Sequence, residues 1–304
     1  MPYRGRFAPS PTGPIHLGTA RTALVAWLAS RAAGGAFVLR VEDLDAPRVK
    51  PGALEAMLAD LRWLGLDWDE GPDVGGAFAP YTQSLRRDRY DAAIETLHRR
   101  GRVFPCTCSR KEIESIASAP HATEEAMYPG TCREGPTHPE RAASLRFRFD
   151  REDARAFVDG VHGPIGAGLG AGDFVVRRAD GVHSYQLAVV VDDLAMEITD
   201  VVRGDDLLSS TPRQIVLIEA LGGRAPRHAH VPLVLGPDGQ RLAKRHGAVT
   251  VREQRDRGVT PELLIARLAR SLGLVDRDDP IAARELVRAF ALDRIASSPV
   301  TMSA

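Results

Sequence analysis

The sequence predicts an α/β fold built on a parallel sheet of Rossmann type. Two apolar strands, over residues 6–8 and 36–41, flank a stretch in which apolar residues recur at helical spacing from Leu17 to Leu28. Gly34 follows that stretch and favours the end of a helix, because glycine readily adopts the left-handed backbone of a helix terminus. A strand, a crossover helix and a second strand form a right-handed βαβ unit, from which doubly wound sheets are built.

The overall composition is that of an ordinary globular protein with balanced charge. Of 304 residues, 44% are apolar and 26% are charged, and the formal net charge is zero. A nucleic-acid partner would therefore have to bind at a local basic face. No apolar run approaches the roughly 18 residues of a membrane span, and the N-terminus lacks a signal-peptide pattern. We expect a cytoplasmic protein with no membrane contact and with two or three domains.

The loop between the first strand and the first helix is a candidate anion site. Prolines and glycines within residues 9–14 break regular structure before His16 opens the helix. The first N–H groups of a helix have no internal partner, and the helix dipole adds partial positive charge there. Gly18 has no Cβ, so a flat base or a phosphate can approach the backbone closely. An ordinary strand–loop–helix entry is the alternative interpretation of these residues alone.

The second strand ends in the acidic run 42–45, at the same sheet edge as the end of the first strand. Ligands of such sheets bind beyond the carboxyl ends of the strands. Glu42 is therefore a candidate pocket residue, with a solvated carboxylate as the alternative. An amphipathic helix over 51–70 and an arginine-rich helix over 85–100 follow. The arginines predict either a solvated face or a track for an RNA backbone.

Three cysteines, Cys106, Cys108 and Cys132, are too few and too clustered for a disulfide framework. Their spacing is compatible with a closed structural zinc site that lacks its fourth ligand. Cysteines with no metal role are the alternative, and the spacing alone does not favour either interpretation. His121 and His138 are the more usual types of fourth ligand.

The middle of the chain, roughly 143–200, is expected to be rich in strands. Residues 144–149, 173–178 and 183–191 each have a strand-like pattern, and a buried strand over 198–206 leads into a polar loop. A helix is then predicted over 212–221, with Thr211 as N-cap and Pro212 at its first position. Because alternating strands and helices resume here, the β-rich part is predicted to be an insertion in the Rossmann domain.

A glycine-rich loop over 235–247 contains Lys244, one of only three lysines in the chain. A lysine on such a loop can place a point charge on the phosphates of a nucleotide as they leave. The remainder, 248–304, is predicted to be helical and without strands.

Four motifs resemble those of the class I glutamyl-tRNA synthetases. They are RFAPSPTG with HLG (6–18), LRVEDLD (39–45), Cys-x-Cys with Tyr-x3-Cys (106–132), and RLAKRHG (241–247). The last is similar to the family's version of the KMSKS loop, except that Ala243 replaces a serine. Tyr-Gln-Leu-Ala at Tyr185 and Val-Val-Arg-Gly-Asp-Asp around Arg203 are similar to segments of the family's glutamate pocket.

The resemblance implies roles for individual residues. It implies ATP binding and catalysis, with Mg²⁺ on the phosphates, by His16, Gly18 and Lys244. It implies one structural Zn²⁺ held by Cys106, Cys108, Tyr128 and Cys132. It implies an L-glutamate pocket formed by Arg6, Phe7, Ala8, Pro9, Ser10, Glu42, Tyr185 and Arg203. Within that pocket, Arg6 is expected to bind the side-chain carboxylate and Glu42 the α-amino group.

The resemblance also implies a domain order. The two catalytic halves are expected at 1–100 and 196–250, separated by a zinc-binding and β-rich insertion at 101–195. Residues 251–304 are expected to form a helical domain like the one that contacts the tRNA stem. The family's large anticodon-reading domain has no counterpart in the sequence.

This organisation resembles the glutamyl-queuosine tRNA(Asp) synthetase family. Such an enzyme activates glutamate with ATP without tRNA and transfers it to the queuosine base of tRNA(Asp). We expect a monomer. Two alternatives are a shortened glutamyl-tRNA synthetase that acylates tRNA(Glu), and a non-catalytic RNA-binding paralogue in which Ala243 marks loss of activity.

Overall fold

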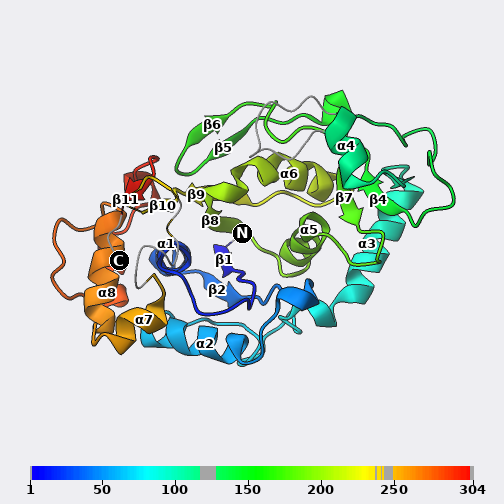
Figure 1. Ribbon diagram of the computed structural model, residues 1–304. Coiled ribbons are helices and arrows are strands. Elements are labelled where there is room, and N and C mark those ends of the chain that lie inside the picture. Colours follow the sequence, from blue (N-terminus) through cyan, green and yellow to red (C-terminus); the bar gives the residue numbers. More distant parts are fainter. Residues whose placement is uncertain (1, 117–127, 237, 241, 243–248, 302–304) are drawn as a thin grey trace.

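The computed structural model describes residues 2–116, 128–236, 238–240, 242 and 249–301. Figure 1 shows an α/β core with helices packed around a central sheet. The strands are β1 (Arg4–Phe7), β2 (Ala36–Leu39), β3 (Val103–Cys106), β4 (Ser144–Phe147), β5 (Phe157–Asp159), β6 (Gly163–Ile165), β7 (Phe174–Arg177), β8 (Asp200–Gly204), β9 (Arg227–Val231), β10 (Val234–Leu235) and β11 (Val300–Thr301). The helices are α1 (Leu17–Ala32), α2 (Ala53–Trp63), α3 (Arg87–Arg99), α4 (Arg110–Ile116), α5 (Tyr185–Ala195), α6 (Thr211–Ala220), α7 (Val251–Asp256), α8 (Pro261–Ser271) and α9 (Ala283–Leu286).

The central sheet has the strand order β2-β1-β8-β9-β5-β6. Strand β1 pairs in parallel with β2 on one side and with β8 on the other, and β9 pairs in parallel with β8 and β5. Helix α1 connects β1 to β2 and ends before Gly34, which has a positive φ of 62°. The predicted βαβ unit and the α/β fold class are therefore confirmed.

Alternate residues of the central strands enter different cores, as the period of two in a strand requires. Phe37 and Leu39 of β2 and Val202 of β8 pack with α1, whereas Val38 and Val201 pack against Met196 and Ile198 on the opposite face. The sheet is buried on both faces, which is typical of a parallel sheet in an α/β protein.

A separate antiparallel sheet, β3-β4-β7, packs with α3, α5 and α6. It includes the strands predicted over 144–149 and 173–178. The hairpin of β5 and β6 lies between β4 and β7 in sequence, yet β5 pairs with β9 of the central sheet. The segment expected to be an insertion thus contributes two strands to the Rossmann-type sheet, and the exact domain boundaries stay a prediction.

One predicted strand is wrong: most of 183–191 lies in helix α5. The hydroxyl oxygen of Ser184 caps this helix by accepting a hydrogen bond from the Leu187 amide at 3.3 Å. The valines at 189–191 are buried between the antiparallel sheet and α6. A short apolar run has the same appearance in a buried helix and in a buried strand, so periodicity could not separate the two.

The carboxyl-terminal segment is mostly helical but not free of strands. Helices α8 and α9 share one core with α1, Figure 1 shows α8 beside α1, and β11 pairs in parallel with β10. Within the part predicted to be helical, residues 283–289 form only the short helix α9 and a following 3-10 turn. A distinct stem-contact domain therefore stays a prediction.

Among the described residues, no helix combines the length and the apolar character needed to cross a bilayer.

Candidate active site

The predicted pocket residues meet at the carboxyl edge of the central sheet. Residues 8–10 follow β1, Glu42 follows β2, and Arg203 lies near the end of β8. The amide of Glu42 donates to the carbonyl of Pro9 at 3.0 Å, so these two strand ends are held together. The chain leaves β1 towards β2 on one side and returns at β8 on the other, which makes this edge the topological switch point where ligands of such folds bind.

The loop residues differ in exposure. The Phe7 side chain is buried in the core with α1, whereas Ala8 and Pro9 are partly buried and Ser10 is exposed. Phe7 therefore contributes to this edge through its backbone, and the amide of Arg40 donates to its carbonyl at 3.0 Å.

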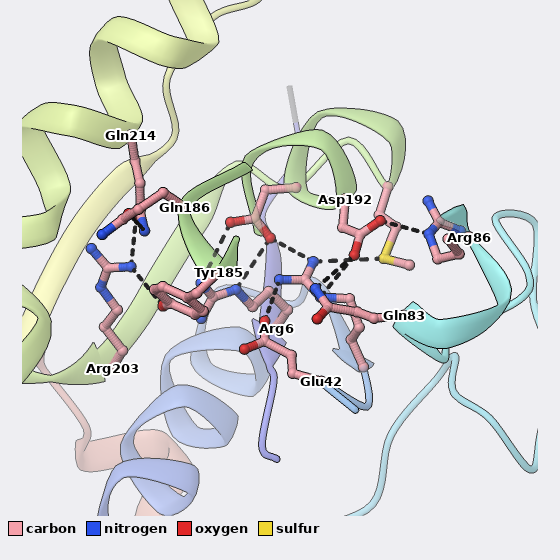
Figure 2. Close-up of polar contacts among 12 residues, drawn as sticks. Arg6, Glu42, Gln83, Arg86, Tyr185, Gln186, Asp192, Arg203 and Gln214 are labelled. Carbon is pink, nitrogen blue, oxygen red and sulfur yellow. Dashed lines mark hydrogen bonds and ion pairs between the residues drawn. The ribbon is translucent and has the colours of Figure 1, made fainter. Parts of the chain in front are cut away.

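A buried ion network holds Arg6 and Glu42 (Figure 2). Arg6 donates to both oxygens of Asp193 at 3.3 and 3.4 Å. Arg40 donates to Asp193 Oδ1 at 2.7 Å and to Glu42 Oε1 at 3.1 Å. The Arg6 fork is thus occupied by a carboxylate of the protein itself.

Asp192, which precedes Asp193 on α5, belongs to the same network. Its fully buried carboxylate accepts from Arg86 at 2.6 Å, from Gln83 at 2.9 Å and from the Tyr90 hydroxyl at 2.9 Å. Several donors on one buried carboxylate are what its burial requires. The helix α5 is therefore fastened to the turn before α3 and to α3 itself.

Two of the acidic groups in contact with Arg40, Asp193 and Glu42, have opposite pKa shifts. Burial raises the pKa of Asp193, but the charges of Arg6 and Arg40 outweigh burial and lower it. Burial raises the pKa of Glu42, and the opposing charges of Arg40 and Arg6 do not fully compensate. A cation placed at Glu42 would supply the missing stabilisation of its carboxylate.

Arg203 has a different environment. Its guanidinium donates to five acceptors, none of which is a carboxylate: His230 Nε2 at 3.0 Å, the Tyr185 hydroxyl at 3.4 Å, the Gln214 amide oxygen at 2.7 Å, the Leu207 carbonyl at 3.2 Å and the Thr211 hydroxyl at 2.7 Å. Burial lowers the pKa of this guanidinium. Within the described part of the chain, Arg203 forms no direct ion pair.

Tyr185 connects the two arginine environments. It opens α5, and Figure 2 shows its ring between Arg203 and the group around Arg6. Burial raises the pKa of the Tyr185 hydroxyl, and the charges that act on it include Arg203, Glu42 and Arg6. The structure therefore brings Arg6, Glu42, Tyr185 and Arg203 together.

Sequence reasoning missed two residues behind Arg203. His230 of β9 accepts from Arg203, and its Nδ1 lies 2.6 Å from Asp159 Oδ2 at the end of β5. Both side chains are fully buried. The sequence signal was weak: a histidine in the apolar run 229–231 and an aspartate before Gly160. Thr211, predicted to be an N-cap, is the first residue of α6 instead; Ser210 is the N-cap, and the Thr211 hydroxyl accepts from Arg203.

The loop predicted to bind an anion leads directly into helix α1. His16 is the N-cap of α1, no acidic residue lies in the first turn, and a Cβ on Gly18 would contact only Val234, at 4.0 Å. The segment after the lysine loop pairs with this helix start: the amide of Leu17 donates to Val249, and that of Val251 donates to Ile15. Ala243 and Lys244 lie outside the described residues.

The three cysteine sulfurs lie within 4.8 Å of one another. Cys108 Sγ is 3.6 Å from Cys132 Sγ, close to the roughly 3.8 Å expected for two sulfurs on one tetrahedral zinc. Burial raises the pKa of the Cys132 thiol, but hydrogen bonds at the Thr137 and Thr107 backbones outweigh it and lower the pKa to about 5. Three cysteine sulfurs at this spacing form a donor set typical of structural zinc sites, so the cluster fits a zinc ion.

The Tyr128 hydroxyl lies beside this cluster. It is 3.3 Å from Cys106 Sγ and 3.8 Å from Cys108 Sγ. The ring nitrogens of His138 face Glu112 and Glu140, each at 3.6 Å. His121 lies outside the described residues.

A class I tRNA synthetase is indicated by this combination of a switch-point pocket, a helix start for phosphates and a cysteine cluster. Residues 3–303 match the family model described as tRNA synthetases class I (E and Q), catalytic domain, and the chain belongs to that family. It is therefore an enzyme of the aminoacyl-tRNA synthetase type, a ligase.

Individual relatives are similar over nearly the whole chain. A glutamyl-Q tRNA(Asp) synthetase of Symbiobacterium thermophilum is 54% identical over 99% of this chain and 96% of its own length. A glutamate–tRNA ligase of an Anaeromyxobacter species is 48% identical over 94% of this chain and 61% of its own length. The crystal structure of a glutamate tRNA ligase from Elizabethkingia meningosepticum, in complex with its amino acid, superposes with a TM-score of 0.86 at 30% identity, over 100% of this chain and 68% of that one.

Proposed function

We propose that this enzyme activates L-glutamate with ATP, in the absence of tRNA, and transfers the glutamyl group to the queuosine base in the anticodon loop of tRNA(Asp). The observation that carries the proposal is the pocket: Arg203, held by uncharged acceptors, donates to the Tyr185 hydroxyl, and the charge of the buried Glu42 acts on that same hydroxyl. An arginine fork is complementary to a carboxylate, and a carboxylate is complementary to the α-ammonium group. The pair therefore fits an amino acid with an acidic side chain. The similarity to glutamyl-Q tRNA(Asp) synthetases supports the choice of acceptor.

In this proposal, Glu42 binds the α-ammonium group of glutamate, and Arg6 and Arg203 lie on the carboxylate side of the pocket together with Tyr185. Residues 7–10 line the entrance through their backbone and the Ser10 hydroxyl. Glutamine should be a poor substrate, because a site that desolvates a charge pair strongly rejects a neutral analogue.

The first step forms a bond between the glutamate α-carboxylate oxygen and the α-phosphorus of ATP, while the bond to pyrophosphate breaks. His16, the α1 start at Gly18 and Lys244 stabilise the charge of the leaving pyrophosphate. A hydroxyl of queuosine then attacks the glutamyl carbonyl, and AMP leaves. No covalent bond to the protein is needed, because positioning and charge stabilisation are sufficient.

Two metal ions belong to the proposal. Mg²⁺ bound to ATP would neutralise phosphate charge, and Cys106, Cys108, Cys132 and Tyr128 would hold a structural Zn²⁺ that orders the β3-β4-β7 region. A monomeric state, a cytoplasmic location and the four-part domain order given above are further parts of the same proposal.

The decisive experiment supplies purified protein, ATP, Mg²⁺ and labelled glutamate with three separate acceptors: tRNA(Asp) containing queuosine, the same tRNA without queuosine, and tRNA(Glu). We expect label only on the first. Label on tRNA(Glu) would instead support a glutamyl-tRNA synthetase activity, the alternative that the 48% identity to a glutamate–tRNA ligase favours.

A glutamate-dependent exchange of pyrophosphate into ATP, measured without tRNA, tests the activation step alone. Absence of exchange and of label on all three tRNAs would point to the non-catalytic RNA-binding paralogue.

A further inference from the structure

The Nε side of Arg203 is held by a histidine instead of a carboxylate. Arg203 Nε donates to His230 Nε2 at 3.0 Å, so that ring nitrogen must carry a lone pair. The Thr211 hydroxyl lies 3.1 Å from the same nitrogen and also accepts from Arg203 Nη2. The hydrogen-bond partners thus assign the ring proton of a neutral His230 to Nδ1.

Asp159 fixes this tautomer from the other side of the ring. Its Oδ2 accepts from His230 Nδ1 at 2.6 Å. Its Oδ1 accepts from three backbone amides, those of Val161 at 2.9 Å, His162 at 3.0 Å and His230 at 3.2 Å. The carboxylate is therefore anchored to the turn between β5 and β6 and to β9, and cannot rotate away from the ring without losing these bonds.

We propose that Asp159 and His230 are positioning residues that orient Arg203 for the carboxylate of the amino-acid substrate. The inference rests on the proposed function, since it assigns glutamate to Arg203. The carboxylate of Asp159, which balances the charge of Arg203, is separated from the guanidinium by the imidazole ring of His230. The remaining donors of Arg203 are left with neutral acceptors, such as the Tyr185 hydroxyl and the Gln214 amide.

This arrangement favours the replacement of a neutral acceptor at Arg203 by a substrate carboxylate. A hydrogen bond between a guanidinium and a carboxylate is roughly twice as strong as one to a neutral acceptor. A substrate carboxylate can therefore replace Tyr185 or Gln214 at Arg203 with a gain. A carboxylate of the protein in direct contact, such as Asp193 at Arg6, would compete with the substrate for the same donors.

We call the hydrogen-bonded series Asp159–His230–Arg203 the relay. The substitution Asp159→Asn tests it with a minimal change of shape. The three amides that converge on Oδ1 require an oxygen there, so the new amide nitrogen must face His230 Nδ1. The ring proton is then forced to Nε2, where it points at the Arg203 Nε–H. We expect KM for glutamate to rise about 30-fold, as for loss of one charge-assisted hydrogen bond, with KM for ATP changed less than about twofold.

Asp200→Asn is the matched control. Asp200 begins β8, the strand that carries Arg203 near its other end, and its carboxylate binds Arg227 of β9 at 2.7 and 2.9 Å. This variant loses an aspartate–arginine contact of the same sheet without touching the relay. We expect it to leave KM for glutamate unchanged, and an equal rise in both variants would overturn the proposal.

Two substitutions of His230 provide a second test if the Asp159→Asn variant does not fold. The amide oxygen of His230→Gln can accept from Arg203 Nε, whereas His230→Leu cannot. We expect the glutamine variant to retain a KM for glutamate close to that of the wild type and the leucine variant to show a rise of about 30-fold or more. Equal KM values in the two variants would contradict the relay.

A readout independent of activity separates this inference from the proposed function. In ¹⁵N-histidine NMR spectra, His230 should be protonated at Nδ1 in the wild type and at Nε2 in Asp159→Asn. Protonation at Nε2 in the wild type would refute the relay even if the enzyme activates glutamate. Absence of glutamate-dependent exchange in the wild type would instead refute the proposed function and, with it, the assignment of glutamate to Arg203.

Discussion

The two buried arginines of the pocket have opposite surroundings. Arg6 is paired with Asp193, which also accepts from Arg40, whereas Arg203 is surrounded by neutral acceptors and reaches Asp159 only through His230. Removing one partner of a buried pair leaves an uncompensated charge and lowers stability, while a buried cation without a direct counter-ion is available to a ligand. We propose from this difference that Arg6 serves chiefly the architecture of the pocket and that Arg203 recognises the substrate carboxylate. The sequence had suggested Arg6 for that role.

The strongest test of this division is Arg203→Ala. Loss of two charge-assisted hydrogen bonds, about 1.5–3 kcal/mol each, should lower kcat/KM for glutamate by about 10²–10⁴-fold. The measurement is glutamate-dependent exchange of pyrophosphate into ATP. Arg203→Lys keeps the charge but not the fork and should recover only part of the loss. If Arg203→Ala retains its kcat/KM while Arg6→Ala loses it, the assignment is reversed.

The free energy of unfolding should depend more on Arg6 than on Arg203. Arg6→Met removes one partner of Asp193 and should lower the free energy of unfolding by about 3 kcal/mol, the lower end for a broken buried pair, because Arg40 still holds the aspartate. Arg203→Met removes a desolvated charge without a direct counter-ion, which partly offsets the loss of its hydrogen bonds, and should lower the free energy of unfolding by less than Arg6→Met does. Urea unfolding of both variants gives the comparison; equal losses would contradict it.

The metal site gives a variant that should affect neither arginine. Cys132→Ser removes a thiolate ligand and should abolish zinc binding, measured by atomic absorption of the purified protein. We expect a Tm lower by several degrees, from disorder of the β3-β4-β7 region. KM for glutamate should change by less than about twofold, because the pocket lies on the other sheet. A large rise in this KM would mean that the two regions are coupled.

A further prediction concerns pH and Glu42. Burial raises the pKa of Glu42, so its carboxylate is lost at a higher pH than that of a free glutamate side chain. Since the ionised form is needed for the α-ammonium group, KM for glutamate should increase as the pH falls through this pKa, by about tenfold per pH unit below it. Glu42→Gln should bind glutamate weakly and lose this pH dependence; an unchanged pH profile would exclude Glu42.

The fold was predictable where a pattern is local. The β1-α1-β2 unit follows from periodicity and from Gly34, and the loop before α1 follows from its prolines and glycines. The described pocket residues that the motifs indicated lie close together in the structure. Helix α5 was not predictable, because its buried valines satisfy either secondary structure. The relay was missed for a different reason: Asp159, His230 and Arg203 lie on three strands, and only the pairing of β5, β9 and β8 makes them neighbours.

The pairing of residues 15–17 with 249–251 constrains Lys244 by covalent distance alone. Thr250 is bridged to His16 at the start of α1, and Lys244 lies six positions earlier in the chain. Six steps of extended chain span at most about 20 Å. In the proposed activation step, the lysine would therefore act at the start of α1 as a tethered group, with an effective concentration in the millimolar range or above.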